Sequence, residues 1–336
     1  MQTSKKIFIR IGSDKAGTVS LAYLVGNNKD KFKSHGVLAP SRNCLSLFHY
    51  LTDKFSLADI GNWEDREPNR VAGISDLIAR IEAGERISDN IFLTTETLWG
   101  RLTKRNLDPI NKSVRILLQS LLEMFPDHQP QIIIHIRRID LYLESLYKQE
   151  VKAGRSQNFK NLIRRATADR AFDFLKILED VFGVENIIIR PFERSQLFNG
   201  CVVQDTLNTL GLSEYIHEYK IVLGNDGLHR DLMETLINLN SRYGKILPNR
   251  QLLEINDLLK NVLKYEDVKH ILPLKTRLDC LKEHRKFYEY LAQKYTGSSS
   301  LFNEPLPDDS HLDYRLKPDR ELLIEKLIFQ IAEQSR

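Results

Sequence analysis

The stretch Lys6–Ser20 constrains the fold of this chain most, because it joins the signals of a strand, a glycine loop and a helix start. Its first part, Ile7–Ile11, is a mostly β-branched run typical of a strand buried on both faces. Gly12 and Gly17 then bracket a four-residue loop, and Thr18 opens a helical pattern. The stretch therefore predicts the first strand, loop and helix of an α/β domain.

The loop between the two glycines contains Lys15. Backbone N–H groups, a helix N-terminus and a lysine together form a site for a phosphate or sulfate group. The alternative is an ordinary turn that happens to contain a lysine. In a magnesium-nucleotide loop the lysine follows the second glycine, whereas here Thr18 and Val19 follow Gly17. The spacing disfavours a kinase or magnesium-dependent hydrolase and favours a phosphate-bearing donor held without a metal.

Further buried strands are predicted downstream, separated by helical patterns. They cover Val37–Pro40, Ile91–Thr94, Gln131–Arg138 and Asn186–Phe192. Strands that alternate with helices are typical of a parallel sheet with helices on both faces. We therefore predict an α/β fold with a three-layer, doubly wound parallel sheet.

From residue 213 onward the pattern becomes wholly helical. Helices are expected over 226–242, 249–264, 274–295 and 318–334. We predict an α/β core over residues 1–212 that carries the donor site, and a helical subdomain over 213–336 that packs on this core.

Composition limits the classes of partner. The chain has 336 residues and a formal net charge of +4, which is too small to indicate nucleic-acid binding. Its three cysteines have no metal-binding spacing, so we expect reduced thiols, no metal and a cytoplasmic protein. The strand pattern begins close to the N-terminus, so no signal peptide is expected. No apolar run approaches about 18 residues, so we expect no transmembrane segment, and peripheral membrane contact stays open.

Three motifs together resemble the sulfotransferases that use 3′-phosphoadenosine 5′-phosphosulfate (PAPS), especially bacterial carbohydrate-type members. Ile11–Leu21 resembles the loop that binds the 5′-phosphosulfate in that family. Ile134–Tyr147 is similar to its 3′-phosphate element, in which an arginine ends a strand and a serine follows eight residues later. Ile188–Arg194, followed by Asp205–Gly211, is similar to the later strand and helix, near which the adenine lies. The likeness covers roughly residues 5–212 and implies a P-loop-NTPase-like fold.

The resemblance implies a role for each matching residue. Lys15 would neutralise charge on the leaving phosphate, within a cradle made by Ala16, Gly17, Thr18 and Val19. The 3′-phosphate would be bound by Arg137 and Ser145, and Phe192 would pack near the adenine. The acceptor would be a hydroxyl or amine of a glycan, a glycolipid or a small metabolite. For the general base, Glu96 follows a strand end and His49 follows a loop expected near the donor, and either suits proton removal.

The loop departs from the family pattern at three positions. Asp14 replaces a proline, Ala16 replaces a hydroxyl residue and Val19 replaces a threonine. A lost hydrogen bond to a charged group weakens binding by about 1.5–3 kcal/mol. The alternative hypothesis is therefore a catalytically degenerate member that binds nucleotide or acts as an interaction module.

Overall fold

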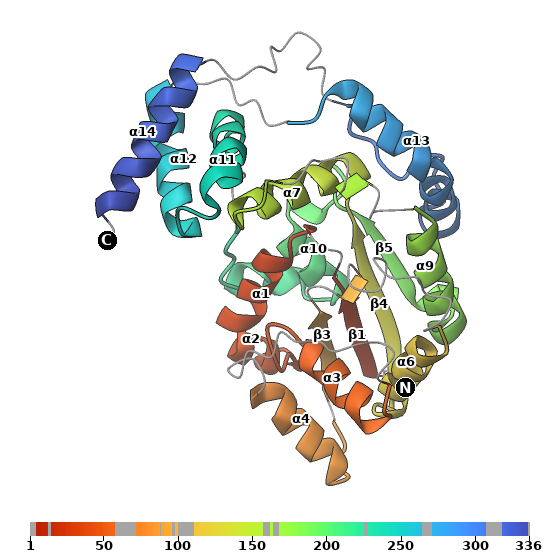
Figure 1. The fold of residues 1–336 in the computed structure, drawn as a ribbon. Helices are drawn as coiled ribbons and strands as arrows, with labels where there is room; N and C mark the ends of the chain where they lie inside the picture. The colour runs from red at the N-terminus through yellow and green to blue at the C-terminus, as the bar shows by residue number, and fades with distance from the viewer. Residues whose placement is uncertain are drawn as a thin grey trace. The chain divides into compact units, whose positions relative to one another are not determined.

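A computed structural model describes residues 5–12, 15–57, 72–87, 89–95, 98–99, 111–156, 162–163, 168–224, 228–263, 271–306 and 318–334. Its centre is a five-stranded, all-parallel sheet in the order β2-β3-β1-β4-β5 (Figure 1). The strands are β1 (Lys5–Ile11), β2 (Val37–Leu38), β3 (Asn90–Thr95), β4 (His128–Ile136) and β5 (Ile187–Pro191). The predicted α/β class and parallel sheet are confirmed.

The alternation within β1 assigns its side chains to two separate hydrophobic cores. Ile7, Ile9 and Ile11 point into one core, whereas Phe8 belongs to the core on the other face. Arg10 shares the face of Phe8, because successive side chains of a strand point to opposite faces. A strand that lies between two neighbours and is covered on both faces must be apolar almost throughout, which explains its isoleucine-rich sequence.

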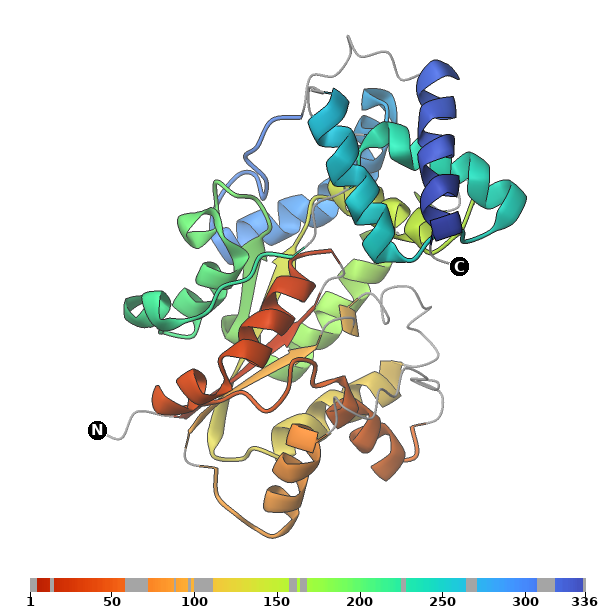
Figure 2. The same cartoon turned by 90° about the vertical axis from the view of Figure 1, so that its left-hand side faces the viewer.

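The helices that cover the Phe8 face are α1 (Thr18–Asn27), α2 (Lys29–Ser34) and α10 (Val202–Thr209). Leu21, Leu24 and Val25 of α1 are buried at helical spacing against this face. Figure 2 shows α1, in red, lying along the sheet. The opposite face is covered by α3 (Leu45–Lys54), α4 (Ala72–Glu82), α6 (Asn111–Glu123) and α9 (Ala168–Phe182). Helices on both faces are compatible with the predicted three-layer arrangement.

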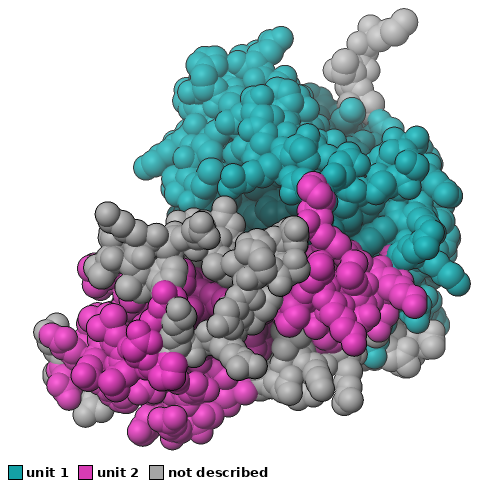
Figure 3. Space-filling model, turned by 90° about the horizontal axis from the view of Figure 1, so that it is seen from above, with its two compact units in different colours: residues 1–138, 167–224, 285–304 teal, residues 139–166, 225–284, 305–336 magenta. Residues whose placement is uncertain are grey.

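The described chain divides into two compact units, which are coloured separately in Figure 3. The first contains residues 1–138, 167–224 and 285–304, and the second contains 139–166, 225–284 and 305–336. The expected domain boundary at residue 212 stays a prediction. The first unit also contains short helical turns: η4 (Val184–Asn186), η5 (Phe198–Gly200), η6 (Ser213–Glu218) and η7 (Ala292–Thr296).

The second unit is helical. It contains α7 (Ile139–Lys152), α11 (Arg230–Tyr243), α12 (Asn249–Leu263), α14 (Pro318–Gln334) and the first part of α13 (Leu274–Leu291). The expected helices beyond residue 213 are confirmed to within a few residues. Inside this unit the buried Arg277 pairs with Glu144 (3.4 Å), and Glu144 accepts the N–H of Leu272 (3.1 Å). These bonds tie the start of α13 to α7.

Candidate anion-binding site at the strand ends

The candidate site lies at the carboxyl ends of β1 and β4, which are neighbours in the sheet. The chain leaves β1 toward α1 on one face, whereas α9, which leads into β5, packs on the other face. Where connections from adjacent parallel strands leave to opposite faces, a crevice opens outside the strand ends, and ligands bind there. Gly12 and Arg137 are the first residues after these two strands.

The loop after β1 is tied to β3 at its first residue and turns sharply at its end. Gly12 donates its N–H to the carbonyl oxygen of Thr95 at the end of β3 (2.7 Å). Ser13 and Asp14 lie outside the described residues. Lys15 and Gly17 have φ values of 68° and 77°, so the chain passes twice through the left-handed region before α1 begins. Residues 15–17 therefore turn sharply into α1.

Gly17 is required by both its backbone and its surroundings. A Cβ at this position would lie 2.6 Å from Cγ1 of Val202 and 3.3 Å from Cε2 of Phe192. The first hydrogen bond of α1 runs from the N–H of Leu21 to the Gly17 carbonyl (3.1 Å). The N–H groups of Thr18, Val19 and Ser20 therefore have no hydrogen-bond acceptor within the helix. Within the described residues, no side chain caps this end of α1, so it can receive an anion.

Arg137 connects the loop with two other strand ends. Its Nη1 donates a hydrogen bond to the carbonyl oxygen of Lys15 (2.6 Å). Its guanidinium lies over the ring of Phe192, with 5.5 Å from Cζ to the ring centroid. Phe192 is held at the end of β5, where its N–H donates to the carbonyl of Ile136 (2.7 Å). The structure thus brings together Lys15, Gly17, Arg137 and Phe192, four residues singled out from the sequence.

A row of buried polar side chains lies under this site, on the face covered by α1 and α10. Arg10 is fully buried, and its Nη2 donates to the carbonyl of Ala16 (2.9 Å). His135 on β4 and Asp205 on α10 are also fully buried, with 3.3 Å between Nε2 and Oδ2. Asp205 also accepts hydrogen bonds from Nε of Arg190 (2.9 Å) and the N–H of Phe198 (2.9 Å).

These contacts set the protonation of the pair. Burial lowers the pKa of His135 to about 4, while its hydrogen bond with Asp205 opposes that shift. Burial would raise the pKa of Asp205, but the hydrogen bonds from His135 and Arg190 hold that pKa well below its usual range. At neutral pH the carboxylate can only accept, so a neutral His135 donates from Nε2. These hydrogen bonds hold β4, β5 and α10 together.

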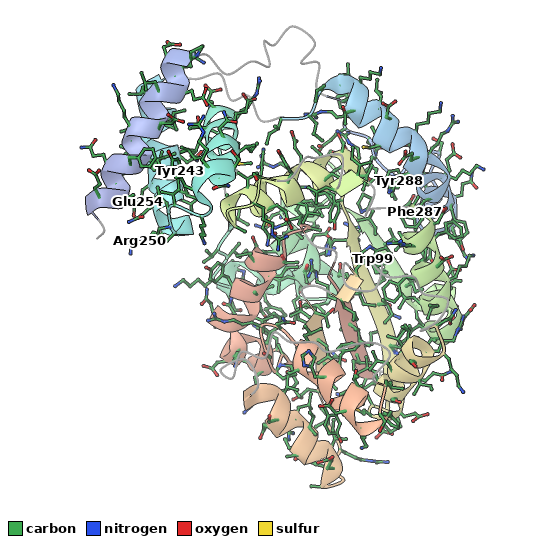
Figure 4. The ribbon with its side chains drawn as sticks, in the orientation of Figure 1. Trp99, Tyr243, Arg250, Glu254, Phe287 and Tyr288 are labelled. Atoms are coloured by element: carbon green, nitrogen blue, oxygen red, sulfur yellow. The ribbon has the colours of Figure 1, made fainter. Side chains whose placement is uncertain are left out.

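The other residues singled out from the sequence are more scattered. Ser145 is half-buried on α7, in the second unit. His49 is half-buried on α3, on the sheet face opposite to α1, and Glu96 lies outside the described residues. Trp99, labelled in Figure 4, packs in the core with its ring 5.3 Å from that of Phe174.

Two buried charged residues near these strand ends were not singled out from the sequence. Arg10 sits within an otherwise apolar strand, and a charge in such a run could have revealed it. Glu193 follows Phe192, and its carboxylate accepts the N–H groups of Asn303 (2.7 Å) and Glu304 (3.2 Å). No local pattern predicts this contact, because its partners lie more than a hundred residues away. Glu193 fastens the segment after η7 beside β5.

The fold and site define an all-parallel α/β protein with a candidate anion-binding loop at its strand ends. No family model and no solved structure matches the chain. It is similar to an uncharacterized protein of Archaeoglobus fulgidus, with 27% identity over 179 residues that cover 51% of this chain and 47% of that protein. The chain thus spans about half the length of this relative. Among the described helices, none is long and apolar enough to cross a membrane.

Proposed function

We propose that this protein is a PAPS-dependent sulfotransferase with the P-loop-like fold of that family. It transfers a sulfuryl group to a hydroxyl or amine of a glycan, glycolipid or small metabolite. The observation that carries the proposal is that Arg137 contacts both Lys15 and Phe192. These three residues come from three separate motifs. An isolated glycine loop would carry much less weight, because many strand-to-helix turns contain a lysine.

The residues present fit a donor with phosphate groups at both ends of an adenosine. The N-terminus of α1 and Lys15 suit the 5′-phosphosulfate. Arg137 suits a second phosphate, because a guanidinium can meet two phosphate oxygens at once. Phe192 offers an apolar ring beside the loop for a base. The lack of a side chain at Gly17 lets the loop backbone pack closely against Val202 and Phe192.

Sulfuryl transfer needs the acceptor in line with the donor and a positive charge at the leaving phosphate. Lys15 supplies that charge, and the backbone N–H groups at the start of α1 hold the donor end. Ser145 is assigned to the second phosphate through the resemblance alone. Glu96 and His49 stay the two proposed bases.

The test is transfer of radiolabelled sulfate from PAPS to cell extracts, comparing the wild type with Lys15→Ala. Lys29→Ala, which alters an exposed lysine of α2, is the matched control. We expect labelling by the wild type and the control and a loss of at least about 100-fold for Lys15→Ala. Equal labelling by Lys15→Ala would refute the role of Lys15.

Calorimetry with the product 3′-phosphoadenosine 5′-phosphate (PAP) separates the alternatives. The absence of binding at millimolar PAP would refute the enzyme hypothesis. Binding of PAP without any sulfuryl transfer from PAPS would favour the degenerate nucleotide-binding module. Binding that required magnesium would favour a kinase.

A further inference from the structure

Arg10 is the largest fully buried polar side chain among the described residues of the first unit. It lies in the central strand β1, and its side chain is fully buried on the face covered by α1. Its register neighbours are Thr94 on β3 and Ile133 on β4. Burying a guanidinium is unfavourable unless its hydrogen bonds and charge are used. An apolar residue would fill this position in an ordinary parallel sheet.

The hydrogen bond from Arg10 fixes the orientation of one peptide group in the loop. Nη2 of Arg10 lies 2.9 Å from the carbonyl oxygen of Ala16. The carbonyl and N–H of a trans peptide point in opposite directions, and no cis peptide occurs in the described chain. Since the Ala16 carbonyl points toward Arg10, the N–H of Gly17 points away from Arg10. Arg137 fixes the preceding peptide in the same way through the Lys15 carbonyl.

The charge of Arg10 adds to this orientation. A guanidinium stays protonated at any working pH, and a buried charge is screened less by salt than an exposed one. Its field reaches the neighbouring side chains, since Arg10 contributes to the lowered pKa of His135. The same field acts on the loop directly above it and favours an anion there.

We propose that Arg10 is a positioning residue for the anion-binding loop: it turns the Gly17 N–H toward the 5′-phosphosulfate end of the donor and stabilises that end from beneath. The proposal rests on the proposed function, because it assigns this loop to the 5′ end of PAPS. Arg10 touches the loop backbone, and the loop touches the ligand.

The test compares two ligands that differ only at the 5′ end. PAP carries both phosphates, whereas adenosine 3′-phosphate lacks the 5′-phosphate. Their affinities are measured by calorimetry for the wild type, Arg10→Met and Arg10→Lys. Methionine has a similar volume without charge or donor, and lysine keeps the charge and one donor. We expect Arg10→Met to bind PAP about 10- to 100-fold more weakly, with an unchanged affinity for adenosine 3′-phosphate. Arg10→Lys should recover most of the PAP affinity.

A measurement on the wild type covers the case in which Arg10→Met does not fold. The amide signal of Gly17 in a glycine-labelled NMR spectrum should move downfield with PAP and stay in place with adenosine 3′-phosphate. A Gly17 amide signal that does not shift when PAP is added would overturn the positioning role of Arg10.

The remaining outcomes separate the two proposals. If the wild type binds PAP and Arg10→Met binds it equally well, or loses both ligands to the same extent, only the role of Arg10 fails. If the wild type binds neither ligand, the proposed function fails and the role of Arg10 fails with it.

Discussion

Arg137 donates a hydrogen bond to the backbone carbonyl of Lys15, although the two residues lie 122 positions apart in the chain. The contact joins the end of β4 to the loop that follows the adjacent strand β1. Arg137 also lies over the ring of Phe192 at the end of β5. One side chain therefore anchors the loop and contacts Phe192, and under the proposed function it also binds the second phosphate.

This double role predicts an unusual ligand pattern for Arg137→Ala. The affinity for PAP should fall by about 10- to 100-fold, because a charged hydrogen-bond donor is lost. The affinity for adenosine 5′-phosphate, which has no 3′-phosphate, should also fall, because the loop loses its anchor. Calorimetry with both nucleotides checks this, with Arg86→Ala, which alters an exposed arginine outside the motifs, as the control. Loss of PAP binding with full retention of adenosine 5′-phosphate binding would contradict the anchoring role.

The surroundings of Gly17 predict a large loss of stability for Gly17→Ala. Gly36 provides the matched control, because its φ of 69° is similar but no atom lies within 4 Å of an added Cβ. The strain of a left-handed alanine alone costs about 1–2 kcal/mol, which is our expectation for Gly36→Ala. Gly17→Ala should lose about 1–3 kcal/mol more, since its Cβ would overlap Val202. Urea unfolding of both variants measures the difference, and equal losses would show that the contact with Val202 is relieved without cost.

The class of fold was predictable because its signals are local. Isoleucine-rich runs such as Ile7–Ile11 indicate buried strands, and helical spacing indicates the helices between them. The order of the strands was not predictable, because it depends on pairing between distant segments. Thus β3 pairs with β1 more than eighty residues earlier, with Ile91 beside Ile7.

The candidate site was predictable only where residues belong to a motif. Lys15 was found through the glycine loop, and Arg137 and Phe192 through the family resemblance, whereas Arg10 and Glu193 were missed. Arg10 was missed because a strand pattern is read for its apolar residues. Glu193 was missed because its partners, Asn303 and Glu304, follow a different helix.

The buried His135 predicts a specific pH dependence of stability. Its pKa is about 4 in the folded protein and near 6.5 when exposed, so the unfolded state takes up a proton first as pH falls. The free energy of unfolding should therefore decrease between about pH 6.5 and 4, by up to about 3 kcal/mol from this group. The lowered pKa of Asp205 affects the free energy of unfolding only at pH values below this window.

Urea unfolding of His135→Gln between pH 7 and pH 4 isolates this contribution, because glutamine can still donate to Asp205 but does not titrate. The difference in stability between wild type and variant should shrink as pH falls through that window. His217→Gln, which changes an exposed histidine, should keep the pH dependence of the wild type. The same slope in His135→Gln as in the wild type would show that another group causes it.

The two loop positions that lack the hydroxyl of the family pattern should respond differently when it is restored. Val19 is 39% exposed on the first turn of α1, so Val19→Thr adds a donor without burying a polar group. We expect a gain in PAP affinity of up to about tenfold with unchanged stability. Ala16 is fully buried, so Ala16→Ser must place an extra atom in a packed site and should lose about 1–3 kcal/mol without any gain in affinity. PAP calorimetry and thermal unfolding of both variants decide the point. A gain for Ala16→Ser with none for Val19→Thr would mean that the ligand approaches the loop from the buried side.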